Sequence, residues 1–161
     1  MSSSMLKVAA AKIKSALKTP RSKSTVFIAL ALLCVTLPFV FYRPAGAVLH
    51  IGSTDYQLTI ASTPATRQVG LGGRQTMSQT SGMLFVFNTS AVECFWMKDM
   101  QFPLDIIWVN PEKKVVHVEQ HLTPATYPKT FCPSTPAKYV IELRAGEAAK
   151  RHIATGQKLD F

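Results

Sequence analysis

The sequence predicts an α+β domain that is mostly β: a compact small sheet or partly closed barrel with two short helices, preceded by one transmembrane helix. Short apolar segments recur through residues 55–161, with either the period-2 alternation or the continuous apolar character of strands. Clusters of glycine, proline and asparagine separate these segments, as expected for turns. An uncharged apolar segment at 25–42 precedes them near the N-terminus.

Positive charge is concentrated near the N-terminus. The 161 residues include 18 Lys and Arg against 9 Asp and Glu, a formal net charge of +9. Residues 1–24 contain basic residues and no acidic ones, whereas no basic run in 55–161 exceeds two residues. Nucleic-acid binding requires a basic face with stacking aromatics. We therefore expect no nucleic-acid partner.

The segment TVFIALALLCVTLPFVFY at 25–42 is near the shortest length that crosses a hydrocarbon core of about 30 Å. The basic tail before it, with only Arg43 soon after it, places the N-terminus in the cytoplasm by the positive-inside rule. The prediction is a single-pass membrane protein, with a cytoplasmic tail at 1–24, a stalk and first short strand at 43–54, and a globular domain outside at 55–161.

A secreted protein is the alternative. The sequence AGA at 45–47 resembles a signal-peptidase site, and cleavage near Ala47 would remove the apolar segment. The length of that segment favours an uncleaved anchor, because the apolar region of a signal peptide is usually about 7–15 residues long.

The first half of the domain predicts a hairpin, a helix and a buried strand. Residues 47–61 form two extended runs around GSTD. A helix then begins at Pro64, capped by Ser62 or Thr63, and the following glycines end it. The apolar run at 81–87 predicts a strand buried on both faces, and NTSA at 88–91 predicts a turn.

The second half predicts more strands and one more short helix. Strands are expected at 94–98, 104–109, 115–120 and 138–143, a helix at 146–153 and a last short strand at 157–161. Four prolines in 121–136 predict a long irregular loop, and such loops are often functional.

The segments CFWMK and LDIIWV predict a core strand pair, because strands apolar on both faces belong in the middle of a sheet. Alternation places Leu104, Ile106 and Trp108 on one face of the second strand, opposite Asp105. A lone buried charge is costly, so Asp105 requires a partner. The candidates are backbone N–H groups of the 99–103 turn and three basic side chains, Lys98, Arg67 and Arg74.

The motifs TPATRQVGLGGR, SGMLFVF, FWMKDMQFPLDIIWVN and PAKYVIEL, in this order, resemble the domain of unknown function 192 family. The resemblance covers roughly residues 55–161. It implies a small mostly-β domain that is often exported or membrane-tethered, and it implies no activity. Asp99 and Met100 depart from the family pattern, which more often has Asn and Thr there.

Cys94 and Cys132 are the two cysteines of the domain. Export would expose them to an oxidising compartment, where disulfides persist. A bridge between them would fix the proline-rich loop. The alternative is a small buried residue at Cys94 and a free loop thiol at Cys132, because spacing alone does not establish the geometry.

A metal site is a weak candidate. His117, Glu119 and His121 recur at every second residue, which places them on one face of a strand, and two His with a carboxylate resemble a zinc ligand set. The simpler interpretation is the solvated face of a half-buried strand. The prediction is no metal and no cofactor.

Two functions, from different classes, remain open. The first is a non-catalytic binding or interaction module for an unknown extracytoplasmic ligand or protein. A pocket with Trp96, Lys98, Asp99 and Asp105 at its rim, closed by the proline-rich loop, would serve it. The alternative is a cell-envelope hydrolase that uses Asp99, Asp105 and a histidine. No Gly-x-Ser-x-Gly motif is present, and the sequence leaves open whether the protein is an enzyme.

Overall fold

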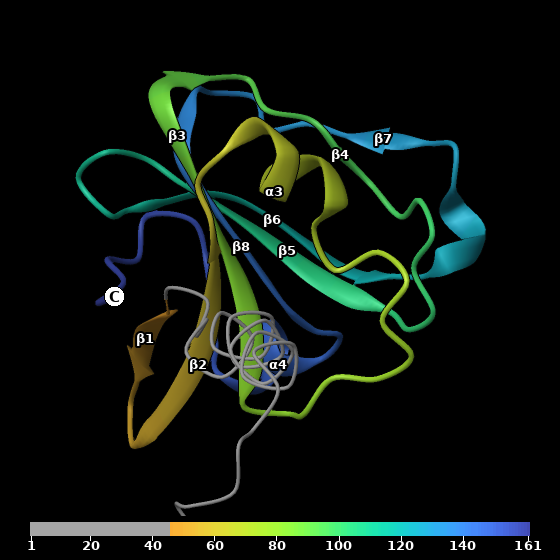
Figure 1. Cartoon of the computed structure of the whole chain (residues 1–161). Helices are drawn as coiled ribbons and strands as arrows, with labels where there is room; N and C mark the ends of the chain where they lie inside the picture. The colour runs from red at the N-terminus through yellow and green to blue at the C-terminus, as the bar shows by residue number, and fades with distance from the viewer. Residues whose placement is uncertain (1–45) are drawn as a thin grey trace, which may run out of the picture. The chain divides into compact units, whose positions relative to one another are not determined.

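The computed structural model describes residues 46–161, so the predicted tail at 1–24 and anchor at 25–42 lie outside the described residues. Within 46–161, no helix is both long enough and apolar enough to cross a membrane. The described part is mostly β with two short helices, as the sequence predicts (Figure 1).

The main sheet has six strands in the order β1-β2-β3-β8-β5-β6. Its strands are β1 Gly46–Ile51, β2 Thr54–Ala61, β3 Ser81–Ala91, β8 Ala137–Arg144, β5 Leu104–Val109 and β6 Val115–Leu122. Only β2 and β3 pair in parallel; the other neighbours are antiparallel. Strand β1 pairs with β2 along its whole length, so residues 46–51 form one edge of this sheet.

The C-terminal segment bridges the two edges of this otherwise open sheet. The N–H of His50 in β1 donates to the carbonyl of Asp160 at 2.8 Å. The N–H of Val115 in β6 donates to the carbonyl of Gln157, also at 2.8 Å. The predicted last strand at 157–161 is wrong, because only two isolated bridges form there, at Lys158 and Asp160.

Strand β5 lies between β8 and β6, and all six of its residues are buried. Its side chains divide between two apolar clusters as the alternation predicts. Leu104, Ile106 and Trp108 belong to one cluster, and Ile107 and Val109 belong to the other. The prediction of a central strand at 104–109 is confirmed.

The predicted partner of that strand is wrong. CFWMK does not enter the main sheet: only Phe95–Trp96 is extended, as β4, and it pairs with β7 Thr130–Phe131 in a separate two-stranded ribbon. Phe95 is half-buried and Trp96 is exposed. The local apolar pattern cannot distinguish a sheet strand from a short ribbon that lies across the sheet.

The helix α3 Pro64–Val69 begins as the sequence predicts. Thr63 is the N-cap, and its hydroxyl accepts from the N–H of Thr66 at 3.1 Å. Gly70 ends the helix at φ 53°, a conformation that glycine adopts without strain. The second helix, α4 Glu147–Lys150, is shorter than predicted, and the 3-10 turn η1 Pro124–Thr126 lies in the proline-rich loop.

Strand β3 is longer than predicted. The segment NTSA at 88–91 continues the strand after a register shift between Val86 and Ala91, where Ala91 pairs with Ala137. Exposed polar residues are compatible with a strand that passes an irregularity near the end of a sheet, so the turn predicted from their composition does not form.

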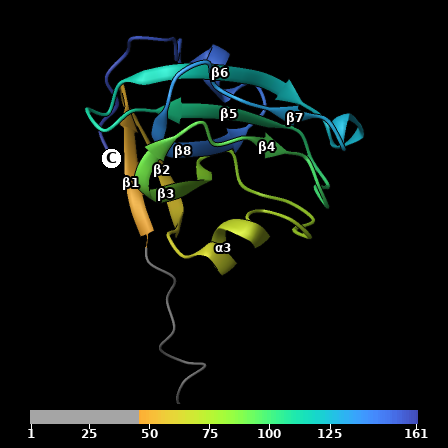
Figure 2. The same ribbon diagram turned by 90° about the horizontal axis from the view of Figure 1, so that it is seen from above.

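Two layers cover the two faces of the sheet. Figures 1 and 2 show α3 and the β4–β7 ribbon on the same face. That face carries the cluster that includes Phe85, Leu71 from the glycine-rich segment and Phe131 from β7. The opposite face carries a cluster with Leu49 from β1 and Leu159 from the C-terminal segment.

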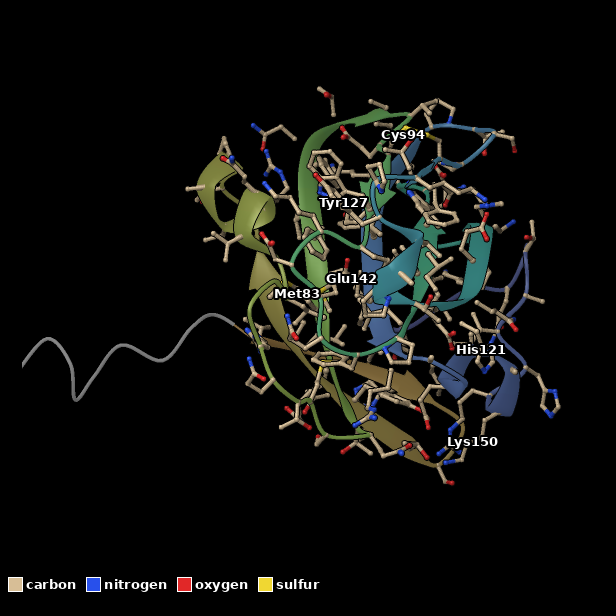
Figure 3. The ribbon with its side chains drawn as sticks, turned by 90° about the vertical axis from the view of Figure 1, so that its right-hand side faces the viewer. Met83, Cys94, His121, Tyr127, Glu142 and Lys150 are labelled. Atoms are coloured by element: carbon tan, nitrogen blue, oxygen red, sulfur yellow. A yellow bond between two sulfur atoms is a disulfide. The ribbon has the colours of Figure 1, made fainter. Side chains whose placement is uncertain are left out.

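The disulfide between Cys94 and Cys132 joins the segment before β4 to the segment after β7. In Figure 3 it lies at the end of the molecule away from Lys150 of α4. The bridge closes a loop of 38 residues in sequence separation. Constraining a loop of this length stabilises a folded domain by roughly 3–4 kcal/mol in the chain-entropy account, which supports a ribbon of only two residue pairs.

Asp105 is fully buried and connects three elements. One carboxylate oxygen accepts from the N–H of His121 in β6 at 2.9 Å, and the other accepts from the N–H of Ala148 in α4 at 2.8 Å. The partners predicted for it, the 99–103 turn and the side chains of Lys98, Arg67 and Arg74, are wrong. Asp105 shares its face with the C-terminal elements.

We predict that Asp105→Asn lowers the free energy of unfolding by about 1–3 kcal/mol, because an amide leaves one of the two buried N–H groups without an acceptor. Urea unfolding followed by circular dichroism measures this change. Asp160→Asn, at an exposed position, is the control and should unfold as the wild type does. An unchanged midpoint for Asp105→Asn would contradict the structural role.

Candidate functional site

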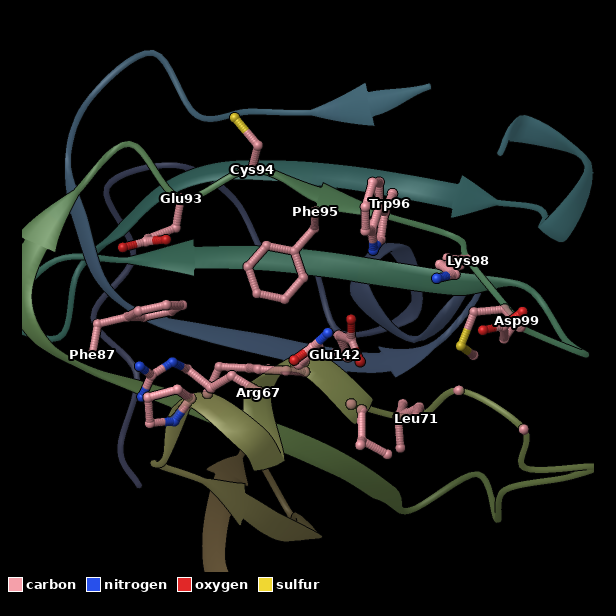
Figure 4. A pocket seen from close by; sticks show the side chains of 18 residues that line it. Arg67, Leu71, Phe87, Glu93, Cys94, Phe95, Trp96, Lys98, Asp99 and Glu142 are labelled. Carbon is pink, nitrogen blue, oxygen red and sulfur yellow. The ribbon is translucent and has the colours of Figure 1, made fainter. Parts of the chain in front are cut away.

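A cleft of about 750 Å³ opens on the face covered by α3 and β4. One wall is formed by α3 and the glycine-rich segment that follows it, and the other by residues 93–100 around β4. Side chains of β3 and β8 form its floor. Figure 4 shows the side chains that line it, with Glu142 between the β4 wall and the Arg67–Leu71 wall.

The floor carries one carboxyl group, that of Glu142 in β8. Glu142 pairs with Met83 in β3 and Ile106 in β5, so it lies between two apolar neighbours in the middle of the sheet. It is 5% exposed, and its Oε2 atom has no hydrogen-bond partner in the structure. Buried polar atoms are nearly always hydrogen-bonded, so an unpartnered oxygen at the floor of a cleft marks a site for a ligand or water.

Burial raises the pKa of Glu142 from its usual 4.5 to about 8, because the charged form loses its hydration. The positive charge of Arg74 opposes this rise but does not overcome it. The Glu142 carboxyl is therefore mostly protonated at neutral pH. A neutral carboxyl can donate a hydrogen bond from a position where a carboxylate could only accept one.

Aromatic side chains line the β4 side of the cleft. The ring of Phe95 makes edge contacts with Phe85, at a centroid distance of 4.9 Å, and with Trp108, at 5.9 Å. These contacts fix Phe95 against the core. Trp96, the next residue, is 50% exposed and contacts Tyr127 at 5.9 Å. Such a wall gives a ligand apolar surface and the faces of π systems.

Two cationic side chains lie over aromatic rings of the cleft lining, one on each wall. The Arg67 guanidinium lies 4.9 Å from the centroid of Phe87, and its Nη1 donates to the carbonyls of Ser62 and Val86. The Lys98 ammonium lies 6.0 Å from the ring centroid of Trp96 and is exposed. Arg67 is therefore held by the backbone, whereas Lys98 is held only weakly.

Three of the four residues predicted for the pocket rim line the cleft: Trp96, Lys98 and Asp99. Asp105 does not, because it is buried on the opposite face with both oxygens bonded to backbone N–H groups. The proline-rich loop does not close the cleft either. It lies behind β4 through the β4–β7 pairing, and α3 with the glycine-rich segment forms the opposing wall.

The weak metal candidates do not converge. His117 Nε2 and Glu119 Oε1 lie 3.2 Å apart, but His121 follows an irregularity between Glu119 and Leu122 and has φ 57°. This break ends the alternation that placed the three side chains together. No group of three metal-ligand residues gathers anywhere in 46–161.

Sequence reasoning missed Glu142. The signal was present in KYVIEL, where a single acidic residue stands among apolar ones in a strand with the composition of a buried strand. An acid at such a position needs a partner or a function. The wall contributed by Arg67 was also missed, because α3 lies about 30 residues before β4 in the sequence.

Two solved structures resemble the domain. A protein of unknown function from Novosphingobium aromaticivorans DSM 12444 is 26% identical, with a TM-score of 0.64, over 73% of this chain and 84% of that one. A protein described as a "putative transcription regulator" from Sinorhizobium meliloti 1021 is 25% identical, with a TM-score of 0.66, over 74% of this chain and 97% of that one.

No curated protein matches the chain. The family model described as DUF192, "Uncharacterized ACR", matches residues 47–161. This match includes the main sheet except its first residue, Gly46, and every wall of the cleft. It confirms the resemblance seen in the sequence motifs. The chain is a member of the DUF192 family.

Proposed function

We propose that this chain is a membrane-anchored protein whose extracytoplasmic domain binds a ligand in the cleft without converting it chemically. The observation that carries the proposal is the unpartnered carboxyl of Glu142, buried at the floor of a cleft with aromatic walls. The lining combines aromatic and aliphatic side chains with several charged ones. Small-molecule sites likewise use apolar surface for contact and placed polar groups for orientation. The volume of about 750 Å³ lies within the range of such sites.

The composition of the lining favours binding over catalysis. It contains no histidine, serine or threonine, and its one cysteine, Cys94, is bonded to Cys132. A nucleophilic mechanism needs an activated nucleophile beside a base. The hydrolase alternative with Asp99, Asp105 and a histidine is disfavoured, because Asp105 accepts two backbone hydrogen bonds on the other face of the sheet.

The "putative transcription regulator" description belongs to the Sinorhizobium protein. For the present domain we propose no nucleic-acid partner. Of the two cations at the cleft, Arg67 is bonded to backbone carbonyls, and Glu93 and Asp99 lie in the same lining. Phosphate binding requires several free cationic groups on one surface.

The anchor at 25–42 and an outside domain account for the disulfide. A bridge between Cys94 and Cys132 persists in an oxidising compartment and is rare in the cytosol. Placement outside the cytoplasm is therefore consistent with the chemistry of the domain.

We predict that the protein stays in the membrane fraction after an alkaline carbonate wash, because an uncleaved apolar helix holds it there. Immunoblotting with an antibody to the domain measures its distribution. Replacing Leu32 and Leu33 with Arg is the control and should move the protein to the soluble fraction. A soluble shortened form that begins near Val48 would show that the apolar segment is removed instead.

We predict that a bound ligand shields Trp96 from acrylamide. Trp96 is 50% exposed and Trp108 is fully buried, so fluorescence quenching by acrylamide reports mainly on the cleft. Compounds that bind the purified protein should reduce the quenching constant about twofold or more, because they cover one exposed aromatic face. Trp96→Phe removes the reporter and should abolish the change. Binding that leaves the quenching of Trp96 unaltered would place the site elsewhere.

The raised pKa of Glu142 predicts that the free energy of unfolding depends on pH. Its pKa is raised to about 8 in the folded state from 4.5, so the folded protein binds more protons than the unfolded chain between these values. Its contribution to stability is fully present below about pH 4.5 and is lost as the pH rises to about 8.

We predict that Glu142→Gln flattens this part of the stability profile and stabilises the protein above pH 8 by a few kcal/mol, about 1.4 per unit of pKa shift. Urea unfolding at several pH values measures the effect. Glu112→Gln, in an exposed turn, is the matched control and should keep the wild-type slope. A Glu142→Gln slope equal to the wild-type slope would show that Glu142 has an ordinary pKa.

A further inference from the structure

We infer that the ligand of the cleft is a small organic cation, a primary or secondary ammonium on an apolar stem, whose N–H groups bond to the Glu142 carboxylate. The inference rests on the proposed binding function and names its ligand class. It follows from three properties of the lining: a buried carboxyl oxygen without a hydrogen-bond partner, aromatic faces that hold cations, and more acidic than basic side chains.

Within the described residues, Glu142 forms no salt bridge or hydrogen bond with a cationic side chain, although the positive charge of Arg74 acts on it. Its Oε2 is buried and unpartnered. Arg67 of the facing wall donates to the carbonyls of Ser62 and Val86, and Arg144 of its own strand donates to the carbonyl of Met77 at 2.8 Å. These two guanidinium groups are bonded to backbone carbonyls, and Arg74 acts on Glu142 through its charge without a hydrogen bond to Oε2. A donor for this oxygen therefore has to come from a molecule that enters the cleft.

The aromatic walls are suited to a cation. The face of a phenyl or indole ring attracts positive charge within about 6 Å. Two rings of the cleft already have cationic side chains at such distances, with Arg67 at 4.9 Å from Phe87 and Lys98 at 6.0 Å from Trp96. Lys98 is exposed and lies at the limit of this range, so a ligand cation placed closer to the Trp96 ring competes with it.

The lining of the cleft carries three acidic and two basic side chains. Its titratable side chains are Arg67, Lys98, Glu93, Asp99 and Glu142. Six charged side chains face Glu142 from the elements packed against it, four of them basic and two acidic. They are Arg67 from α3, Arg74 from the glycine-rich segment, Glu93, Lys98 and Asp99 from the β4 segment and Arg144 from β8, whereas β3 and β5 contribute apolar Met83 and Ile106. An anionic ligand would meet Lys98 as the one basic side chain of the lining that is not bonded to the backbone, beside the carboxyl groups of Glu93, Asp99 and Glu142.

Binding of an ammonium changes the protonation of Glu142. In the empty cleft at neutral pH the carboxyl holds its proton, because burial raises its pKa to about 8. A bound ammonium stabilises the carboxylate, so the O–H bond breaks and the proton passes to the buffer. One proton is then released for each ligand bound below about pH 7, and fewer are released as the pH approaches and passes 8. A neutral ligand that accepts a hydrogen bond from Glu142 releases none.

The test uses three probes of similar shape and different charge: 2-phenylethylamine, 2-phenylethanol and phenylacetate. Isothermal titration calorimetry on the full chain in detergent micelles measures affinity. Repeating each titration in two buffers of different ionisation enthalpy, near pH 6.5 and near pH 8.5, gives the number of protons released. Titrations of each probe into protein-free micelles correct for partition of the probes into detergent, and Glu112→Gln is the matched control for Glu142→Gln.

We expect the amine to bind at least tenfold more tightly than the alcohol and phenylacetate to bind least, with about one proton released near pH 6.5 and clearly fewer near pH 8.5. Glu142→Gln should reduce the preference for the amine to about twofold or less, and Glu112→Gln should keep it. The proton count comes from the wild type and therefore stands even if the Glu142→Gln protein folds poorly.

The alternative outcomes separate the inference from the proposed function. Equal or tighter binding of the alcohol or phenylacetate, with reduced quenching of Trp96, overturns the cation and leaves the binding function in place. Amine binding without proton release near pH 6.5 also overturns the inference, because Glu142 is then not the group that contacts the ammonium. If none of the probes binds, both the cation and the use of the cleft for small ligands are overturned.

Discussion

The central strands β8 and β5 carry apolar side chains that are buried on both faces, so both faces of the sheet must be covered. The rest of the structure follows from this constraint. The C-terminal segment with α4 covers one face. The other face is covered by two separate pieces, the α3–glycine segment and the β4–β7 ribbon. Because these two pieces come from different parts of the chain, they leave a cleft between them, and Glu142 lies at its floor.

Asp105 and Glu142 are buried acidic residues on adjacent strands, and they differ in the hydrogen-bond donors that their carboxyl oxygens meet. Both oxygens of Asp105 accept backbone N–H groups, which compensates for the lost hydration and ties β5 to β6 and α4. Glu142 lies one strand away on the opposite face and has no such donor for its Oε2. Asp105 therefore contributes to the fold, whereas Glu142 costs stability in its charged form and is available to a ligand.

The β4 wall depends on few interactions of its own. The ribbon has two residue pairs, Phe95 and Phe131 are its apolar contacts with the core, and the bridge between Cys94 and Cys132 holds its two strands together. A short ribbon on an exposed surface is marginal without additional constraints. The disulfide thus does more than fix the proline-rich loop, because it also holds one wall of the candidate site.

The sequence by itself determined the elements whose signals are local. The hairpin at β1–β2, the capped start of α3 at Pro64, the buried strand β5 with its alternating faces and the mostly-β class all follow from neighbouring residues, because capping, turn formation and alternation act over a few positions. The candidate rim residues Trp96, Lys98 and Asp99 also come from one short segment, so their proximity is a local feature as well. The family follows from ordered motifs, and the match over 47–161 confirms it.

Only the tertiary structure decided which residues meet across the chain. In the folded domain, CFWMK lies outside the main sheet, and Asp105 accepts from the N–H groups of His121 and Ala148. The helix α3 lies opposite β4, with Glu142 between them. The physical reason is that pairing partners and coverings of a sheet are fixed by the burial of apolar surface contributed by distant segments. A local pattern indicates that a residue is buried. The hydrogen-bond donor or the cavity that the residue meets depends on the whole fold.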